Sequence, residues 1–276
     1  MGTSIRNSKP LLFASLGLTG GVVGALAGEL VPSFRGSAVG LIATTSAWSA
    51  FCGGVIAVAL FAASELYHRR RGFYSIQALR YLRAGAIGGA IAGAVAQAIY
   101  GTQFVPPDVQ NLILRPLCWG LMGAILGWRL ASTIPNLSAV RAAIAGGIGG
   151  TLGGVAFLIA GAFLPETFGR MAGIGALGVA LGLAIVVVDS LFREATIEII
   201  WAPKEITTVA LGRVPVTIGG GDDHIHVAGL PQNAAGVVID QGKIQYVDTV
   251  SGRRTDLRDG SKIKIGPIEV VVHATH

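Results

Sequence analysis

Six long apolar stretches, separated by short polar connections, dominate the first 192 residues of the chain. They cover residues 11–31, 40–64, 84–100, 112–130, 142–164 and 171–192. A bilayer core of about 30 Å needs about 20 apolar residues in a helix. The third stretch is the shortest, but it is rich in Gly and Ala and carries no charge. The pattern therefore predicts six transmembrane helices.

Basic residues gather in the connections on one side of these stretches. Of the twelve Lys and Arg in residues 1–192, seven precede the first stretch or lie between the second and third, and two more, Arg129 and Arg141, bracket the connection between the fourth and fifth. Arg193 follows the sixth stretch on the same side, whereas Arg35, Arg115 and Arg170 belong to the other side. Because cytoplasmic loops collect Lys and Arg, both termini are expected in the cytoplasm, with the chain in a bacterial inner membrane.

The six stretches form an internal repeat of three helical hairpins, each of about 60–65 residues. The first helix of each hairpin is dense in Gly and Ala and leads to a proline at its outer end: Pro32, Pro106 or Pro165. The first stretch also has features of a secretory signal peptide, with Ala25-Leu26-Ala27 as a cleavage site. Its place in the repeat favours a retained membrane helix instead.

The glycines of the first, third and fifth helices, here called the odd helices, follow a spacing of four residues. They are Gly20, Gly24 and Gly28; Gly85, Gly89 and Gly93; and Gly146, Gly150 and Gly154. Small residues at this spacing leave a flat groove in which two helix backbones approach closely. We therefore expect the odd helices to form the close-packed centre of the bundle. The alternative is that some grooves face outward and dock partner helices or a second copy of the chain.

Few ionisable residues fall within the apolar stretches. Glu29 is near an outer turn, whereas Glu65 and Asp189 are close to the cytoplasmic ends, Asp189 beside Arg193, where we expect them to be paired or solvated. No stretch has a charge at its middle, which argues against an ion-coupled transporter. Residues 69–83 mix arginines with apolar side chains, which predicts either a helix on the membrane surface or a plain basic loop.

From residue 193 the pattern changes to short alternating runs separated by turns. Residues 196–200, 216–218, 224–227, 243–247, 262–265 and 268–272 are predicted strands. The predicted turns are Gly219-Gly220-Gly221-Asp222, Gln241-Gly242 and Asp259-Gly260. About eight strands predict an all-β sandwich. The chain therefore divides into a helical membrane bundle, residues 1–192, and a soluble β-domain, residues 193–276.

Three segments of the β-domain resemble a forkhead-associated (FHA) domain. Val216-Thr217-Ile218-Gly219 is similar to the first glycine signature of that family, and Asp223-His224-Ile225-His226-Val227 to the strand after it. Residues 259–266 are similar to the closing run of the family. The resemblance covers residues 195–273, under a third of the chain, and implies a sandwich whose loops bind phosphothreonine peptides.

The loop residues depart from those through which the family binds phosphate. Gly220 stands where an arginine is expected, and the expected serine and histidine are missing near Gln232 and Ala234. A shortened turn with Arg253 and Arg254 replaces the Asn-Gly-Thr turn. Because a phosphate needs several converging donors, we expect a partner-binding surface around Gly220, Gln232, Arg253 and Arg254 that does not need phosphate on its ligand.

No motif in the chain predicts catalysis, a metal or a cofactor. Cys52 and Cys118 lie in apolar runs, as buried hydrophobic residues do. His224 and His226, two residues apart beside Asp222, are expected to be ordinary strand residues rather than metal ligands. The β-domain has nine Lys and Arg against ten Asp and Glu, which does not fit a nucleic-acid-binding face.

These patterns favour a membrane-anchored scaffold or accessory subunit. Its helices would pack with one another, contact membrane lipids and offer surfaces to partner helices, while its FHA-like domain docks a protein partner in the cytoplasm. The alternative is a channel or transporter subunit regulated by that domain. A continuous polar path through the bundle would favour the pore, whereas an apolar, filled bundle would favour the scaffold.

Overall fold

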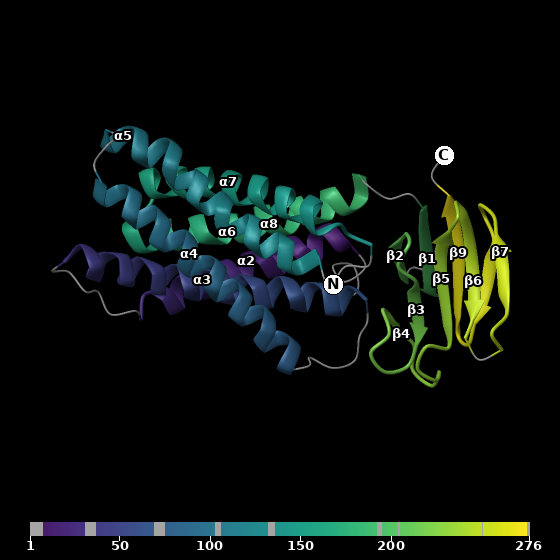
Figure 1. Ribbon diagram of the computed structural model, residues 1–276. Helices are drawn as coiled ribbons and strands as arrows, with labels where there is room; N and C mark the ends of the chain where they lie inside the picture. The colour runs from purple at the N-terminus through teal and green to yellow at the C-terminus, as the bar shows by residue number, and fades with distance from the viewer. Residues whose placement is uncertain are drawn as a thin grey trace.

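The computed structural model describes residues 8–30, 37–68, 75–102, 106–131, 136–191, 195–203, 205–249 and 251–274. Six helices that are long and apolar enough to cross a membrane are followed by a β-domain (Figure 1). They are α2 (Lys9–Gly28), α3 (Ala38–Tyr67), α4 (Ser75–Thr102), α6 (Arg115–Leu130), α7 (Ala139–Phe163) and α8 (Glu166–Leu191). A short α5 (Pro107–Val109) and the π-helical η1 (Gln110–Leu114) lead into α6. The predicted fold class, a helical membrane bundle followed by a β-sandwich, is confirmed.

Helix α4 differs from the prediction at its start. It runs without a break from Ser75 to Thr102, so residues 75–83 are its first turns and form neither a separate surface helix nor a loop. Tyr81 explains this continuity, because its ring is buried and stacks on Phe61 of α3 with 4.6 Å between the ring centroids. Residues 69–74 of the predicted surface segment lie outside the described part of the chain.

The six helices pack as a ring in the order α2, α3, α4, α6, α7, α8 and back to α2. The second helix of each hairpin, α3, α6 or α8, also contacts the other two in the middle of the ring. No extended contact joins α2, α4 and α7 to one another within the described residues. The expectation that the odd helices form the centre is therefore wrong. The centre needs side-chain volume, which glycine and alanine do not supply.

Large apolar side chains from α3, α6 and α8 fill the centre in three layers. The layers repeat at the same offsets from Gly53, Gly123 and Gly178: one residue before, three after and seven after. They consist of Cys52, Met122 and Leu177; Ile56, Leu126 and Leu181; and Leu60, Leu130 and Ile185. Each of these side chains is at most 1% exposed. This part of the bundle is a filled apolar core.

The three glycines from which these layers are counted, Gly53, Gly123 and Gly178, also mark an internal threefold repeat in the packing. Each faces a glycine of an odd helix: Gly53 faces Gly85, Gly123 faces Gly146, and Gly178 faces Gly17. A methyl group placed on either member of a pair would collide with the carbonyl oxygen of the other member. The helix backbones are therefore in direct contact at three equivalent crossings, where dispersion and weak Cα–H···O contacts hold them together.

All nine glycines of the odd helices that the sequence singles out lie against a neighbouring helix of the same chain. Gly85, Gly89 and Gly93 face α3, and Gly146, Gly150 and Gly154 face α6, in each case the helix of the preceding hairpin. Gly20, Gly24 and Gly28 instead face α3 of their own hairpin, while Gly17 and Gly21 meet α8. The grooves at these nine positions are thus filled within the chain.

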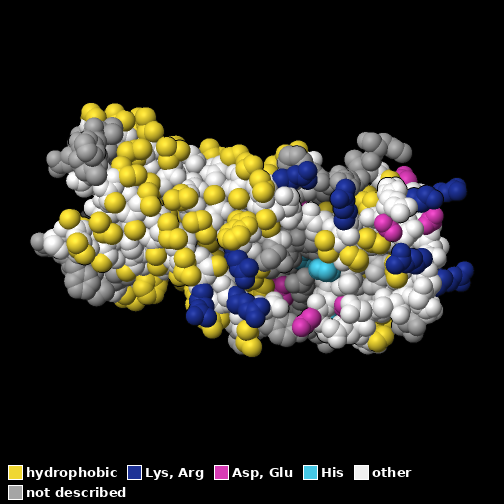
Figure 2. All heavy atoms as spheres, viewed as in Figure 1, with side chains coloured by type: hydrophobic (Ala, Val, Ile, Leu, Met, Phe, Trp, Pro, Cys, Tyr) yellow, Lys and Arg dark blue, Asp and Glu magenta, His cyan; other side chains and the backbone are white. Residues whose placement is uncertain are grey.

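Basic side chains mark the end of the bundle that adjoins the β-domain. Figure 2 shows hydrophobic side chains over the visible face of the bundle and Lys and Arg gathered at that end. Lys9, Arg80 and Arg141 lie near the starts of α2, α4 and α7, and Arg129 lies at the end of α6. The alternation of helix directions brings all four to the side on which α8 leads into the β-domain (Figure 1).

The β-domain consists of two sheets packed face to face. The four-stranded sheet has the order β2 (Glu205–Leu211), β1 (Ala195–Ala202), β9 (Ile268–Ala274) and β8 (Lys262–Ile265). The five-stranded sheet has the order β4 (Ile225–His226), β3 (Val216–Gly219), β5 (Ala235–Asp240), β6 (Lys243–Asp248) and β7 (Arg254–Leu257). Alternating residues such as Ile197 and Ile199 of β1, and Val216 and Ile218 of β3, are fully buried in one shared core.

The six predicted strands are present, and three more strands, β2, β5 and β7, complete the sheets. All three predicted turns contain left-handed backbone conformations, with φ of +72° at Gly221, +48° at Gln241, +77° at Gly242 and +75° at Gly260. Strand β7 reads Arg-Thr-Asp-Leu. It is too short and too polar to give an apolar alternation, and only its pairing with β6 makes it a strand.

Candidate functional site

Two hydrogen-bonded clamps join the bundle to β2, the strand of the four-stranded sheet that lies nearest to it (Figure 1). Helix α3 has 30 residues, or a length of about 45 Å, and so extends past a membrane core. Tyr67 at its end donates its hydroxyl to the carbonyl oxygen of Thr208 at 3.2 Å and accepts the Thr208 amide at 3.0 Å. One side chain thereby binds both the backbone N–H and the backbone C=O of Thr208 on the edge strand β2.

Asn136 forms the second clamp. Its amide nitrogen donates to the carbonyl oxygens of Ala210 at 3.3 Å and Val214 at 3.1 Å, and its amide oxygen accepts the Val214 amide at 3.0 Å. Gly212 leaves room for this side chain, since an added Cβ would lie 2.6 Å from the Asn136 amide oxygen. The two clamps fix residues 208–214 of the β-domain against the bundle.

A buried ion pair lies beside the Tyr67 clamp. Lys9 Nζ is 2.7 Å from Asp189 Oδ2, and the two side chains are 7% and 2% exposed. Lys9 also lies 5.3 Å from the centre of the Tyr67 ring, so one ammonium group links α2, α8 and the end of α3. Asp189 is paired, as expected for a charge near the cytoplasmic end, but its partner is a lysine 180 residues away and its carboxylate is buried.

Other polar residues at this end are buried as well. Glu65 is 4% exposed and His68 is 1% exposed. His68 Nδ1 lies 2.9 Å from the carbonyl oxygen of Ser64, which holds the ring against its own helix. Arg193, the neighbour expected for Asp189, lies outside the described residues.

The four sequence-predicted binding residues lie at one end of the five-stranded sheet. Gly220 and Gln232 form a backbone bridge there, and the Gly220 amide donates to the carbonyl oxygen of Pro231 at 2.9 Å. The carboxylate of Asp223, a residue only 2% exposed, accepts the Asn233 amide at 2.8 Å. Backbone groups and Asp223 thus hold the loop after β4 in a fixed shape.

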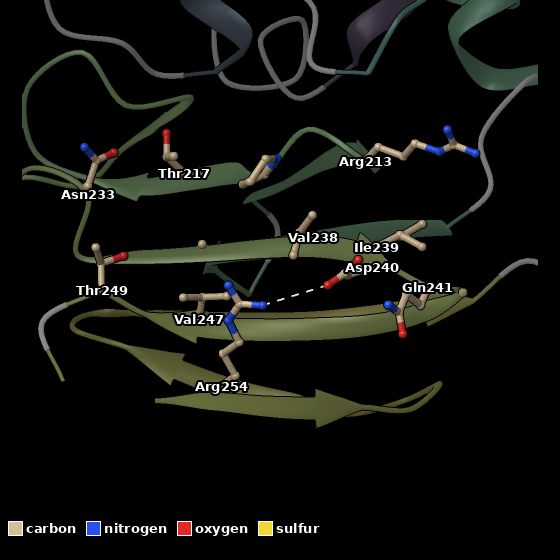
Figure 3. A pocket seen from close by; sticks show the side chains of 13 residues that line it. Arg213, Thr217, Asn233, Val238, Ile239, Asp240, Gln241, Val247, Thr249 and Arg254 are labelled. Atoms are coloured by element: carbon tan, nitrogen blue, oxygen red, sulfur yellow. Dashed lines mark ion pairs between the residues drawn. The ribbon is translucent and has the colours of Figure 1, made fainter. Parts of the chain in front are cut away.

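Arg253 and Arg254 do not converge with Gly220 on one point. Three strand-to-strand steps separate β3 from β7, a distance of roughly 14 Å at about 4.8 Å a step. Arg254 is the first residue of β7 rather than part of a turn, and its Nη1 lies 3.8 Å from Asp240 Oδ2. Its side chain therefore extends over the sheet instead of toward the Gly220 loop (Figure 3).

A groove crosses the outer face of this five-stranded sheet (Figure 3). Its volume is about 880 Å³, within the range of ligand-binding clefts. Gly236 of β5 lies on its floor, where an added Cβ would meet no atom closer than 4.0 Å. The half-buried Val238 and Val247 line it beside Gly236, and Arg213 lies at its rim. No local sequence pattern predicted this groove, because one glycine within a strand carries little information.

The histidines of the β-domain are bonded separately. His224 Nδ1 accepts the Thr217 amide at 3.2 Å, and His226 Nδ1 lies 3.3 Å from the Gly221 carbonyl oxygen. Within the described ranges no group of three His, Cys, Asp or Glu side chains is placed to hold a metal ion.

A further polar contact inside the bundle lies in the half away from the β-domain. Thr45 donates its hydroxyl to the Gln97 amide oxygen at 3.1 Å, joining α3 to α4. At that end Arg170 pairs with Glu29 at 3.1 Å, with about a third of each side chain exposed. Toward the β-domain the polar contacts give way to the three apolar layers.

Neither a protein-family model nor a curated protein nor a solved structure matches this chain.

Proposed function

We propose that this protein is a membrane-anchored scaffold or accessory subunit whose β-domain docks a partner protein. The observation that carries the proposal is the set of three apolar layers, nine side chains that are each at most 1% exposed, across the middle of the bundle. Such a core supports an anchor that holds the β-domain at a fixed place. The loops and outer sheet face of that domain, rather than the helices, then carry the binding function.

A channel or transporter subunit regulated by the β-domain is the second candidate. A channel or transporter must form a path that polar groups line and that ions can enter at some stage of its gating or transport cycle. Opening such a path would require Leu60, Leu130 and Ile185 to separate, together with the layers above them. The backbone contacts at Gly53–Gly85, Gly123–Gly146 and Gly178–Gly17 oppose that movement. These contacts favour the scaffold.

The proposed location of the β-domain is the cytoplasm, at a bacterial inner membrane. The support is the gathering of basic residues at the end of the bundle next to the β-domain, because cytoplasmic loops are the ones enriched in Lys and Arg. Reporter fusions after Phe34, Pro107 and Glu166 are expected outside, and fusions after Tyr74, Asn136 and His276 inside. A reporter fused to His276 that is active only outside would overturn this orientation.

We propose an FHA-like β-domain that does not need phosphate on its ligand. Gly220 uses its amide within the loop, and Arg254 pairs with Asp240, so few donors remain to converge on one phosphate. A phosphothreonine peptide library titrated against the full-length protein in detergent is expected to bind no better than its dephosphorylated form. Binding at micromolar concentration that is abolished by dephosphorylation would contradict this.

Partner capture tests the scaffold itself. Full-length tagged protein would be cross-linked in cells and purified in mild detergent, beside an Arg253→Glu/Arg254→Glu variant. Lys262→Glu/Lys264→Glu is the matched control, since it makes the same charge change on the opposite sheet. A partner is expected with the wild type and the control and reduced with the first variant. Ion flux through the protein in liposomes, with no enriched partner, would contradict the scaffold.

A further inference from the structure

The groove on the outer face of the five-stranded sheet has a specific physical origin. Gly236, Val238 and Asp240 lie at alternate positions of β5 and line the groove, and Gly236 itself is buried, as are Ala235 and Val237. At Gly236 there is no side chain, and the nearest atoms to an added Cβ are 4.0 Å away in Pro215 and Val216. The protein therefore leaves space there that an apolar side chain of a ligand would fill.

The rim of the groove is more basic than the domain around it. The β-domain as a whole has nine Lys and Arg against ten Asp and Glu. The groove has two arginines, Arg213 and Arg254, and one carboxylate, Asp240, which lies between them and pairs with Arg254 (Figure 3). Arg213 is exposed and forms no ion pair with any other described residue. Among the described residues of the groove, one positive charge is thus left without a carboxylate partner next to an apolar floor.

We propose that this groove binds a short acidic segment of the partner protein. An apolar side chain of the segment occupies the space over Gly236 between Val238 and Val247, and a neighbouring Asp or Glu meets Arg213. The apolar contact supplies affinity through buried surface, and the charge pair supplies orientation and selectivity. This inference rests on the proposed docking function and names the chemistry of the partner.

Fluorescence polarisation of labelled octapeptides on the full-length protein in detergent tests the inference. Each library peptide carries Leu or Val next to Asp or Glu, and a matched set carries Lys in place of the acid. Acidic peptides are expected to bind the wild type and the Lys264→Glu control equally, and Lys peptides to bind neither. Arg213→Glu is expected to weaken binding by about tenfold, since like charges then face one another.

Gly236→Val gives a second, independent variant. A β-branched residue suits a strand, and the space above Gly236 lets the domain fold, so thermal stability is expected to be unchanged. Filling the groove is expected to weaken binding by more than about tenfold through the steric clash with the ligand. Acidic peptides whose binding is unchanged in both variants would overturn the proposal, as would a library with no binder.

Two further outcomes separate this proposal from the docking function. A partner protein that co-purifies with wild type and with both groove variants would leave the scaffold standing and overturn the groove. Peptides that bind at the groove, with no protein captured in cells, would support the groove and overturn the scaffold. Binding to vesicles of anionic phospholipid that Arg213→Glu abolishes, with no peptide binding, would assign the groove to lipid headgroups and overturn a peptide ligand.

Discussion

The bundle and the β-domain use glycine in opposite ways. In the bundle, glycines such as Gly85 and Gly146 bring two helix backbones into contact, and the space that they leave is filled by the neighbouring helix. In the β-domain, Gly242 and Gly260 adopt a left-handed backbone in turns, and Gly236 leaves an unfilled groove. Glycine therefore allows close helix packing in the bundle and leaves an open groove on the surface of the β-domain.

The ion pairs of the bundle and of the β-domain also differ, in how deeply they are buried. The Lys9–Asp189 pair of the bundle is buried, with side chains 7% and 2% exposed, whereas the Arg254–Asp240 pair of the groove is 65% and 52% exposed. Buried charges depend on their partners, while exposed charges exchange them for water at little cost. The difference indicates a fixed support in the bundle and an adaptable surface on the β-domain.

Removing one carboxylate from each pair tests this comparison with the largest expected effect. Asp189→Asn leaves the Lys9 ammonium buried without its carboxylate and is expected to lower the free energy of unfolding by about 3–5 kcal/mol. Asp240→Asn, the matched change in the exposed pair, is expected to cost at most about 1 kcal/mol. Thermal unfolding in detergent measures both. Equal losses would remove the distinction between the two sites.

Glycine substitutions within one helix give the next largest effect. A side chain at Gly150 would collide with the carbonyl oxygen of Trp119, whereas an added Cβ at Gly161 of the same helix meets no atom within 4 Å. Gly150→Leu is therefore expected to destabilise by about 1–3 kcal/mol, and Gly161→Leu to leave stability near wild type. Gly89→Leu and Gly101→Leu form the equivalent pair in α4. Unchanged melting of Gly89→Leu and Gly150→Leu would mean that these crossings do not hold the bundle together.

Substitutions in the two clamps between the domains should give the smallest loss of stability. Tyr67→Phe removes a hydroxyl that bonds both the amide and the carbonyl of Thr208, at a net cost of about 1 kcal/mol. Asn136→Ala is expected to cost a similar amount at Val214. Hydrogen exchange should quicken at the Thr208 amide in the first variant and at the Val214 amide in the second. The Asp248 amide, bonded within the β-domain to Arg253, is the internal control and should not change.

Sequence periodicity was sufficient for the six helices and for six of the nine strands, because both depend on local alternation of apolar and polar residues. It failed at the centre of the bundle, because glycine spacing reports where backbones approach but not where Leu126 or Leu181 places its volume. It also missed the Lys9–Asp189 pair and the Tyr67 and Asn136 clamps. These contacts join residues 74 to 180 positions apart, and no local pattern encodes them.

The filled core of the bundle is the central claim, and the protein carries a native probe of it. Cys52 lies in the first apolar layer and is fully buried. In a Cys118→Ala variant in sealed vesicles, a membrane-impermeant maleimide is expected to leave Cys52 unmodified from either side and to label it only after denaturation. Rapid labelling of Cys52 in the folded protein would reveal a water path through the bundle and contradict the account.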